Sequence, residues 1–481
     1  MTVPHDWAIY GPFSSLNDKQ EVAISQDGQK EAMEHAGRTG GLPFVGVGWY
    51  RTEFDVPQFQ AGKRATILFD GAMSHANVYI NGQKVGYWPY GYNSFHFDIT
   101  KYLKPGEKNT LAVRLENLPE SSRWYPGAGL YRNVHLIITE DAYIPVWGTY
   151  ITTPSVNEKF AKVNVRTKVV LPEGADPANY SVETSVWNPN KQKLTAVRTS
   201  LAQMKYNNNQ AEQEFVIQTP SLWSPEMPAL YSAETRLYEG DKLKDIYTTP
   251  FGIRSIEIIP DKGFFLNGKR TVFKGVCNHH DLGPLGAAVN DAAIRRQIRI
   301  LKDMGCNAIR TSHNMPAPEL IKACDEMGMM IMAESFDEWN VAKCKNGYNL
   351  LFDEWAEKDL VNLLHNFRNN PSVVMWCIGN EVPNQWNEGD CKIAKWLQDI
   401  CHREDPTRPV TQGMDAPDAV VNNNFAAVMD VAGFNYRPFK YKINYKKLPQ
   451  RIVLGSETAS TVSSRGVYKF PVERKAMAKY D

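Results

Sequence analysis

Polar residues that could support catalysis follow six short apolar segments in the second half of the chain. In proteins built on parallel strands, the carboxyl ends of the strands meet at one edge of the sheet, and reactive side chains gather there. We therefore expect these residues to converge on one site: Asn278, His279, His280 and Asp281; Arg310, Ser312 and His313; Glu334 and Asp337; Asn380 and Glu381; Asn435 and Tyr436; and Glu457.

Glu381 and Glu457 stand out, because each ends an apolar segment at a short step that contains glycine. Two carboxylates that face each other across a pocket can hydrolyse a glycosidic bond. One protonates the leaving oxygen, while the other attacks the anomeric carbon or activates water. A separation of about 5–5.5 Å would make the reaction retaining. Negative charge nearby would raise the pKa of the protonated carboxyl and keep an acid available near neutral pH.

The same pattern leaves alternatives open. Glu334 also follows an apolar segment and competes for either role. The carboxylates could instead pair with Arg310 or with helix N-termini and have no catalytic part. Tyr436 could hydrogen bond to a carboxylate or fill the mouth of the site. The adjacent His279 and His280 point apart on an extended chain, so we expect one to face the site and the other the scaffold, without a joint metal site.

The elements that must position these residues alternate between strands and helices after about residue 251. Asn290 is placed to cap the first helix and Gly328 to stop the second. Near-continuous apolar strands between amphipathic helices indicate a parallel sheet, either doubly wound or a (β/α)8 barrel that is one βα unit short. Seven apolar segments predict its strands: 271–276, 308–309, 329–332, 373–378, around 410, 431–434 and 452–454.

The first half of the chain is predicted to be all β. Val78 and Ile80 alternate with polar residues, and Asn81 and Gly82 then supply a hairpin turn. Many short strands separated by Gly and Pro predict a sandwich or jelly roll over residues 1–140. Residues 141–251 repeat the alternation over a length of ~110 residues, which suits an immunoglobulin-like sandwich.

Composition narrows the classes of function. The length of 481 residues suggests about three domains. Lys and Arg number 54 against 53 Asp and Glu, a balance that argues against nucleic acid or an anionic membrane as partner. No apolar run approaches the ~20 residues of a transmembrane helix, and the first residues lack a signal-peptide pattern. The seven cysteines include no CxxC pair, so neither a zinc site nor a redox motif is expected.

Taken together, the motifs resemble glycoside hydrolase family 2, and within it the β-galactosidase-like members. The resemblance runs over nearly the whole sequence. The first half carries it at 4–7 (PHDW), 48–51 (GWYR), 77–82 (NVYING), 90–92 (YGY), 122–125 (SRWY), 129–132 (GLYR), 222–225 (LWSP), 230–231 (LY) and 251–254 (FGIR). The second half carries it at 275–280 (GVCNHH), 307–313 (NAIRTSH), 324–328 (CDEMG), 369–372 (NNPS) and 379–381 (GNE).

The resemblance implies a retaining exo-β-glycosidase that hydrolyses terminal β-D-galactosides through a covalent glycosyl-enzyme. It implies a sugar-binding jelly roll over 1–140, an immunoglobulin-like sandwich over 141–251, and a catalytic TIM barrel over 252–481 that lacks its last βα unit. A carbohydrate substrate is the expected partner, and a homo-oligomer is compatible with the sequence. No cofactor is required, although some relatives bind Mg²⁺ or Na⁺ near the site.

The resemblance also implies a role for each site residue. Glu381 matches the general acid and base, and Glu457 matches the nucleophile, which leaves Glu334 as a supporting carboxylate. Asn380 would hydrogen bond to the sugar 2-hydroxyl, and Tyr436 would orient the nucleophile. The remaining residues would line the sugar subsite or hold the nucleophile: His279, Arg310, His313 and Asp337.

Two departures from the family pattern and several other functions stay open. The strands that usually precede residues 4–7 are missing, as are the eighth barrel strand and the later β domains. We therefore expect a piece of a longer protein with weak activity or none by itself. The compartment is cytoplasmic if the lack of a signal peptide is native, and periplasmic if the native N-terminus is missing.

Among the other functions, β-glucuronidase activity is disfavoured, because no clear Asn-x-Lys motif follows a strand to hold the sugar carboxylate. β-Mannosidase activity stays open, because the preferred orientation of the 2-hydroxyl is not readable from sequence. A carbohydrate-binding protein without catalysis is the alternative from another class. A nucleotide-binding enzyme is disfavoured, because no phosphate-binding glycine motif follows the first strand.

Overall fold

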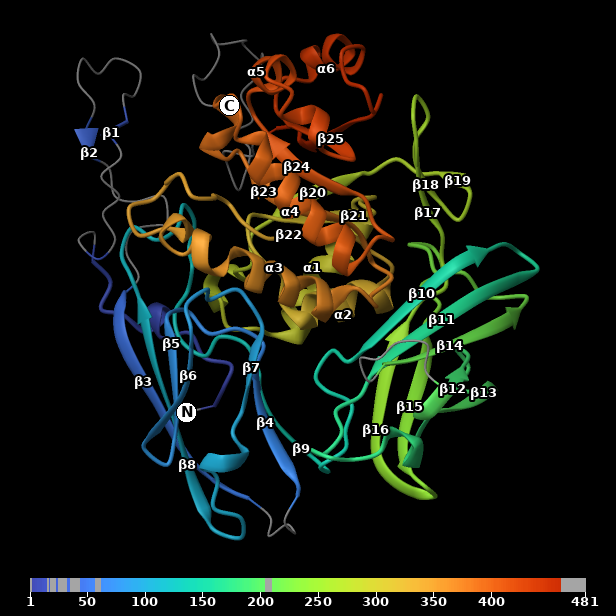
Figure 1. The fold of residues 1–481 in the computed structure, drawn as a ribbon. Coiled ribbons are helices and arrows are strands. Elements are labelled where there is room, and N and C mark those ends of the chain that lie inside the picture. The colour runs from blue at the N-terminus through green and yellow to red at the C-terminus, as the bar shows by residue number, and fades with distance from the viewer. Residues whose placement is uncertain are drawn as a thin grey trace.

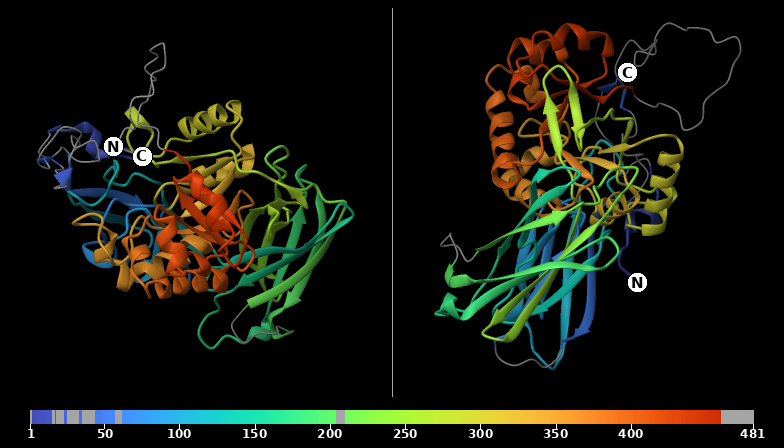
Figure 2. Two further views of the ribbon diagram at one scale, coloured as in Figure 1. Left: turned by 90° about the horizontal axis from the view of Figure 1, so that it is seen from above. Right: turned by 90° about the vertical axis from the view of Figure 1, so that its right-hand side faces the viewer.

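The computed structural model describes residues 2–14, 17, 23–24, 33–34, 44–56, 62–203 and 210–459. The chain forms two β-sandwiches, drawn blue and green in Figure 1, and an α/β part, drawn yellow to red, that contacts both. Figure 2 shows the two sandwiches next to each other on one side of the α/β part. No helix among the described residues is long and apolar enough to cross a membrane.

The N-terminal sandwich has two antiparallel sheets around a core that includes Phe69, Val78 and Val113. Asn81 and Gly82 join two strands as predicted, with φ of 50° and 80°, the conformation that a two-residue hairpin turn requires. One sheet has the order β3 (Gly46–Asp55), β8 (Lys108–Asn117), β5 (Ala76–Ile80), β6 (Gln83–Trp88), and the other β7 (Phe95–Asp98), β4 (Arg64–Phe69), β9 (Val134–Thr139). A separate pair is formed by β1 (Ala23–Ile24) and β2 (Met33–Glu34).

The second sandwich is immunoglobulin-like and follows the alternation in its sequence. Along one strand Ala161, Val163 and Val165 are fully buried, and the residues between them are not. Its sheets have the orders β10 (Thr149–Val156), β11 (Phe160–Lys168), β14 (Gln210–Gln218) and β13 (Lys193–Ser200), β12 (Tyr180–Trp187), β15 (Tyr231–Glu239), β16 (Lys242–Phe251). A small sheet then leads to the α/β part: β17 (Ile256–Ile259), β18 (Gly263–Leu266), β19 (Lys269–Arg270).

The α/β part is a curled sheet of seven parallel strands in sequence order. Its edge strands approach at their carboxyl ends, where Cys277 Sγ donates to the carbonyl of Ser456 at 3.3 Å. The strands are β20 (Gly275–Asn278), β21 (Ala308–Thr311), β22 (Met330–Glu334), β23 (Val373–Asn380), β24 (Val410–Met414), β25 (Val431–Asn435) and β26 (Val453–Glu457). The helices are α1 (Asp291–Asp303), α2 (Pro318–Met327), α3 (Phe352–Phe367), α4 (Cys391–Glu404), α5 (Pro417–Asn422) and α6 (Pro438–Tyr445).

The local signals in this part are largely confirmed. Asn290 caps α1 by accepting from the backbone N of Ala293 at 3.0 Å, and Gly328 ends α2 with φ of 73°. The first strand is an exception, because it starts at Gly275 instead of residue 271. The side chain of Asn307 bonds to the backbone of Val272 and Lys274, which holds this apolar segment as a connection outside the sheet.

The N-terminal sandwich is fixed to the carboxyl-end loops of the parallel sheet. Tyr90 Oη donates to the carbonyl of Ser335 at 2.8 Å, and Arg132 donates to the carbonyl of Met315 at 2.8 Å. Tyr90 also belongs to the same buried apolar cluster as the α/β helices. This packing places loops of the sandwich beside the strand ends where the polar residues lie.

Candidate active site

The residues predicted for the site meet at the carboxyl ends of the parallel strands. Hydrogen bonds and ring contacts connect the eight residues that the resemblance gives a catalytic or substrate-binding role. Asn435, the last residue of β25, is also among the residues expected at the strand ends, although without a specific role. The predicted residues are His279 after β20, Arg310 in β21, His313 after β21, Asp337 after β22, Asn380 and Glu381 at the end of β23, Tyr436 after β25, and Glu457 at the end of β26.

Glu381 and Glu457 share one hydrogen-bond donor, the amide nitrogen of Asn435. This Nδ2 lies 2.9 Å from Glu381 Oε1 and 3.3 Å from Glu457 Oε2, so the two oxygens are at most about 6.2 Å apart, the two distances end to end. The same nitrogen is 3.0 Å from Asn380 Oδ1, and Ser456 Oγ donates to Asn435 Oδ1 at 2.7 Å. An amide NH2 has two hydrogens and here faces three acceptors. Asn435 is therefore the group that ties the two carboxylates together.

Glu457 is held by donors on both of its oxygens. Tyr436 Oη donates to Oε1 at 2.5 Å, and Arg310 Nη1 donates to Oε2 at 3.0 Å. His313 Nε2 lies 3.9 Å from Oε2. These contacts place one positive charge and one hydroxyl on the carboxylate and fix its orientation at the end of β26.

Glu381 has different surroundings. Its backbone turns sharply after β23, with φ of 42°, and its N donates to the carbonyl of Gly413 at 2.7 Å. Burial raises the pKa of Glu381, and the negative charges of Asp415 and Glu457 add to this, against the hydrogen bond from Asn435 and the positive charge of Lys343. The protonated form of this carboxyl therefore persists to higher pH than in an exposed glutamate.

Arg310 and Glu334 form a buried support below the two carboxylates. Arg310 Nε donates to Glu334 Oε2 at 2.5 Å, and its Nη2 donates to Asn380 Oδ1 at 2.9 Å. His313 Nδ1 lies 2.7 Å from the other oxygen of Glu334, and Cys377 Sγ donates to Oε2 at 3.0 Å. Glu334 is fully buried and both of its oxygens are occupied. Its geometry is that of a supporting residue, not of a group that reaches a substrate.

His313 is a neutral member of this support. Burial lowers its pKa well below the usual range, and the charge of Arg310 acts in the same direction. A neutral imidazole beside a carboxylate carries its hydrogen on the nitrogen that faces that carboxylate. Nδ1 of His313 donates to Glu334 when that carboxyl is ionised, and this contact sets the orientation of the ring.

The N-terminal sandwich contributes Arg123 to the site. Its Nε and Nη2 donate to Asp337 at 2.8 and 2.6 Å, and Lys343 Nζ lies 3.0 Å from the same carboxylate. Burial alone would raise the pKa of Asp337, but the charges of Lys343 and Arg123 outweigh burial and hold it well below its usual range. Asp337 in turn accepts from Asn380 Nδ2 at 3.0 Å. Asn380, the residue before Glu381, is thus held in place by residues of two domains.

The two adjacent histidines face opposite sides, as the sequence indicates. The ring of His279 stacks on Trp124, with centres 5.1 Å apart, and meets His313 edge to face at 5.6 Å. His280 Nε2 lies 3.0 Å from the carbonyl of Pro126 in the scaffold. Burial lowers the pKa of His280 to about 3, so it is neutral. Only His279 is on the side of the carboxylates.

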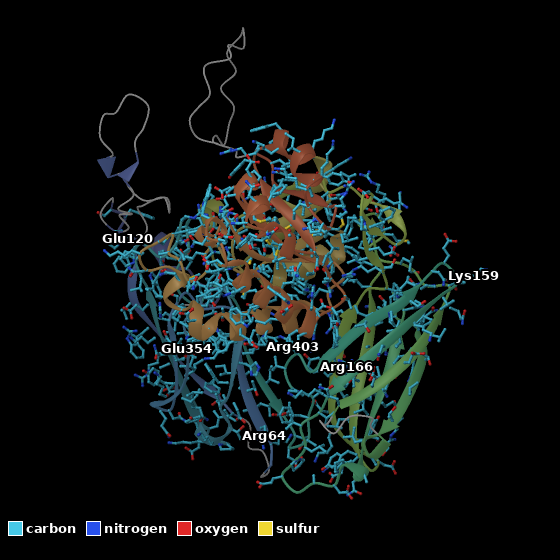
Figure 3. The ribbon with its side chains drawn as sticks, turned by 45° about the horizontal axis from the view of Figure 1, so that its top comes forward. Arg64, Glu120, Lys159, Arg166, Glu354 and Arg403 are labelled. Atoms are coloured by element: carbon cyan, nitrogen blue, oxygen red, sulfur yellow. The ribbon has the colours of Figure 1, made fainter. Side chains whose placement is uncertain are left out.

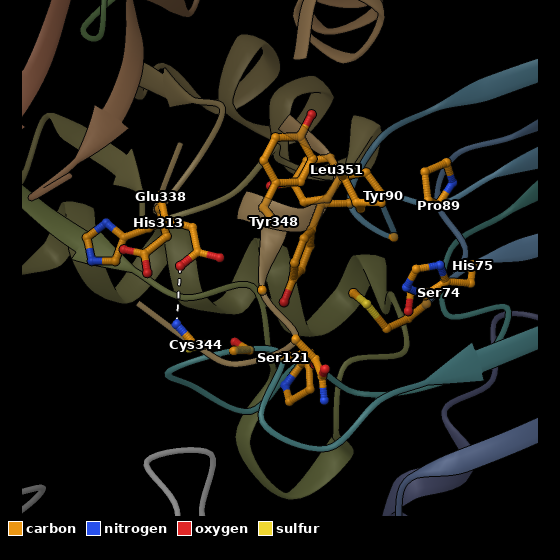
Figure 4. A pocket seen from close by; sticks show the side chains of 18 of the residues that line it. Ser74, His75, Pro89, Tyr90, Ser121, His313, Glu338, Cys344, Tyr348 and Leu351 are labelled. Carbon is orange, nitrogen blue, oxygen red and sulfur yellow. Dashed lines mark hydrogen bonds between the residues drawn. The ribbon is translucent and has the colours of Figure 1, made fainter. Parts of the chain in front are cut away.

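A small pocket of about 80 Å³ opens between the N-terminal sandwich and this network. Figure 4 shows His313 and Glu338 at one end of it and Tyr348 and Tyr90 towards the middle. Glu338 accepts a hydrogen bond from the backbone N of Cys344 at 3.2 Å, drawn as a dashed line, and so holds the loop that carries Lys343.

Three residues of the network have no role in the sequence-based prediction. Asn435 ends an apolar strand and belongs to the polar set, but its link to both carboxylates depends on how the strands pack. Arg123 lies in the SRWY segment, which supported the family resemblance but gave no indication that Arg123 contacts the site. Lys343 is in a loop without any pattern. Among the described residues no three His, Cys, Asp or Glu side chains are grouped as metal ligands, so we assign none to Mg²⁺ or Na⁺.

Models of one protein family match nearly the whole chain. They are the "Glycosyl hydrolases family 2, sugar binding domain" at 42–140, "Glycosyl hydrolases family 2" at 143–254 and the "Glycosyl hydrolases family 2, TIM barrel domain" at 257–479. The chain belongs to glycoside hydrolase family 2. The three matches follow the order of the two sandwiches and the curled parallel sheet.

Similar proteins carry two kinds of name. A β-galactosidase of Bacteroides ovatus is 39% identical over 98% of this chain and 57% of its own length. A putative β-glucuronidase of Formosa agariphila is 34% identical over 98% of this chain and 41% of its own length. This family 2 chain therefore spans about half the length of the curated relatives it matches.

Solved structures show the same fold. A glycosyl hydrolase family 2 member from Bacteroides cellulosilyticus matches with a TM-score of 0.83 at 34% identity, over 94% of this chain and 57% of that chain. The β-glucuronidase 2 of Bacteroides uniformis, covalently bound to cyclophellitol-6-carboxylate aziridine, matches with a TM-score of 0.72 at 25% identity, over 90% of this chain and 51% of that chain.

Proposed function

We propose that this family 2 chain is a retaining exo-β-glycosidase for terminal β-D-galactosides, with Glu381 as acid and base and Glu457 as nucleophile. One observation carries the proposal: the two carboxylates share the Asn435 amide and have opposite surroundings. Glu457 accepts from Tyr436 and from the charged Arg310, whereas burial and negative neighbours raise the pKa of Glu381. Such unequal environments separate a nucleophile from a proton donor.

The reaction has two steps. In the first, the carboxylate of Glu457 attacks the anomeric carbon while Glu381 gives its proton to the glycosidic oxygen, so that the bond to the aglycone breaks and a glycosyl ester forms. In the second, Glu381 takes a proton from water, the water attacks the anomeric carbon, and the ester bond to Glu457 breaks. Two inversions leave the sugar in its original configuration.

The other residues orient these groups. Asp337 and Arg310 hold both ends of the Asn380 amide, at 3.0 and 2.9 Å, in a fixed plane beside Glu381, which suits a contact with the sugar 2-hydroxyl. Tyr436 fixes the rotation of Glu457. The remaining positions line the sugar subsite beside the nucleophile: His279, Arg310, His313 and Asp337.

The surroundings of Asn380 favour a galactoside over a glucuronide. A glucuronide carries a carboxylate that needs an uncommitted cation or amide donors. Within the described residues around Asn380, Arg123 and Lys343 are both paired with Asp337, and Arg310 is paired with Glu334 and Glu457. The β-galactosidase of Bacteroides ovatus is also more similar to this chain than the putative β-glucuronidase of Formosa agariphila is.

Hydrolysis of nitrophenyl β-galactoside, β-glucuronide and β-mannoside tests the proposal. Any turnover by this chain is expected to be weak and to favour the galactoside, with a β-configured first product in NMR. Glu457→Gln should lower kcat by several orders of magnitude, because the nucleophile is removed. Glu388→Gln, an exposed glutamate before α4, is the matched control and should leave kcat unchanged.

Each other outcome has a defined meaning. Preference for the glucuronide or mannoside would disprove the galactoside part and keep the glycosidase. An α-configured first product would contradict the retaining mechanism. If no substrate is hydrolysed and calorimetry with Glu457→Gln shows galactoside binding, the chain by itself is a carbohydrate-binding protein.

A further inference from the structure

A large opening lies at the other end of the parallel sheet from the two carboxylates. It is a groove of about 1100 Å³ between the immunoglobulin-like sandwich and the α/β part, near the amino ends of β23 and β24. Its walls are β10 and β11 on one side and the C-terminal ends of α3 and α4 on the other. Figure 3 labels Arg166 on the first wall and Arg403 on the second.

Two arginines on opposite walls converge on one aromatic ring. The guanidinium carbons of Arg166 and Arg368 lie 5.9 and 4.6 Å from the ring centre of Tyr150. Within the described part of the chain neither forms an ion pair. Arg368 Nε is buried without a hydrogen-bond partner, and its other nitrogens reach only the carbonyls of Glu404 and Trp147, at 3.5 Å. Two like charges therefore meet here, and among the described residues neither has a carboxylate within salt-bridge distance.

The acidic residues nearby are already neutralised. Glu404 accepts from His365 and from Arg403, each at 2.7 Å. Asp405 is fully buried and paired with Arg408 at 2.6 Å. These carboxylates are bonded to closer partners, so their attraction to Arg368 acts only over a longer distance.

The groove has further features that suit an anionic carbohydrate. Lys168, exposed on the same strand as Arg166, adds a third positive charge without an ion pair among the described residues, and Glu257 is the one exposed acid of the walls outside such a pair. The volume exceeds the ~300–1,000 Å³ of common small-molecule pockets, so the groove has room for a chain of sugars. Half-buried Trp147 gives the wall an aromatic surface.

We propose that this groove binds an oxyanion, a carboxylate or sulfate ester, that is carried on a glycan, with Arg166, Arg368 and Lys168 as its cations. Guanidinium groups match the planar and tetrahedral oxyanions with paired N–H donors, and an anion between them removes their mutual repulsion. The choice of a glycan as the carrier rests on the proposed glycosidase function. The anion site itself rests on the unpaired arginines.

Calorimetric titration with a heparin hexasaccharide at low salt tests this site, with Glu457→Gln as the parent chain so that no turnover interferes. Adding Arg166→Gln and Lys168→Gln should weaken binding at least about tenfold, because charge-assisted hydrogen bonds are lost. The matched control adds Lys159→Gln and Lys193→Gln, which remove the same charge from exposed positions outside the groove, and should keep the affinity of the parent.

Three results would overturn the proposal: no binding to the parent, equal loss in the control pair, or inorganic sulfate binding as tightly as the hexasaccharide, which would indicate a free-anion site. Galactoside turnover, measured with Glu457 intact, should be unchanged by Arg166→Gln with Lys168→Gln. If the chain turns over galactoside but does not bind the hexasaccharide, the proposed anion site is disproved and the proposed glycosidase function is not. A chain that binds the hexasaccharide and hydrolyses nothing disproves the proposed function alone.

Discussion

At the scale of single residues, Glu381 and Glu457 are chemically identical side chains that their neighbours make different. Glu457 faces a guanidinium and a phenol, each within hydrogen-bond distance. Glu381 is partly buried, receives one amide hydrogen bond from Asn435, and feels the negative charge of Asp415 and the positive charge of Lys343. The first arrangement fixes the orientation of the Glu457 carboxylate, and the second favours a Glu381 carboxyl that keeps its proton.

This difference predicts the pH dependence of the reaction. Formation of the glycosyl ester needs a protonated Glu381. We therefore expect kcat/KM to fall as the pH rises through the pKa of Glu381, which burial moves above the ordinary value of 4.5. With a poor leaving group, Glu381→Gln should lower kcat/KM by about 10²–10⁴ and remove this alkaline limb. The measurement is a pH profile of kcat/KM for both proteins. An alkaline limb that persists in Glu381→Gln would assign it to another group.

At the scale of elements, the ends of neighbouring strands leave little free space. All residues of β24 are buried, and Gly413 lies beside the site with no side chain. A Cβ there would be 2.6 Å from Arg310 Nη2 and 2.9 Å from Asn435 Oδ1. The missing side chain is what lets the guanidinium reach both Asn380 and Glu457.

We predict that Gly413→Ala displaces Arg310 and impairs catalysis. Overpacking should cost about 1–3 kcal/mol of stability. A shift of the guanidinium by about 1 Å should lower kcat/KM by about 10²-fold, because the groups that it orients would leave the geometry that the reaction requires. Thermal unfolding and kinetics, both on the purified chain, check the two effects. A stable variant with the kcat/KM of the parent would show that the strand end has room for a methyl group.

At the scale of the whole molecule, the two sandwiches have different relations to the parallel sheet. The N-terminal one shares a buried cluster with the α/β part and extends Arg123 into the site. The immunoglobulin-like one contacts the amino-end side, where Arg254 donates to the carbonyls of Pro371 and Val373. The candidate active site is therefore built by the N-terminal sandwich and the α/β part together. The groove is built by the immunoglobulin-like sandwich and the α/β part.

We predict that Arg123 acts as a positioning residue through Asp337. Arg123→Gln leaves Asp337 with Lys343 as its one cation, so Asn380 should shift and kcat/KM should fall by about 10²-fold. Arg123→Lys should restore part of the loss, because it keeps the charge and loses the paired geometry. The checks are kcat and KM, measured where circular dichroism shows a folded chain.

The control for this variant lies in the same sandwich. Arg114→Gln removes an arginine that pairs with Glu116 at 2.9 Å and does not contact the site. It should leave kcat/KM unchanged. An equal loss in both variants would mean that the N-terminal sandwich contributes stability and no orientation.

Local patterns predicted the elements better than the contacts between them. The cap at Asn290, the stop at Gly328 and the turn at Asn81 and Gly82 are each decided within a few residues, and all three are confirmed. The first strand was placed too early, because Val272 is apolar but stays 55% exposed in a connection held by Asn307. Apolar character alone does not tell a strand from an extended loop.

The sequence by itself determined the order of the three parts, the parallel sheet and the set of polar residues at its strand ends. These follow from periodicity, because a strand or helix buries one face whatever its partners are. Only the tertiary structure decided that Asn435 links the two carboxylates, that Glu334 lies below them, and that Arg123 reaches Asp337 from another domain. These contacts join residues far apart in the chain, and their distances depend on how whole elements pack.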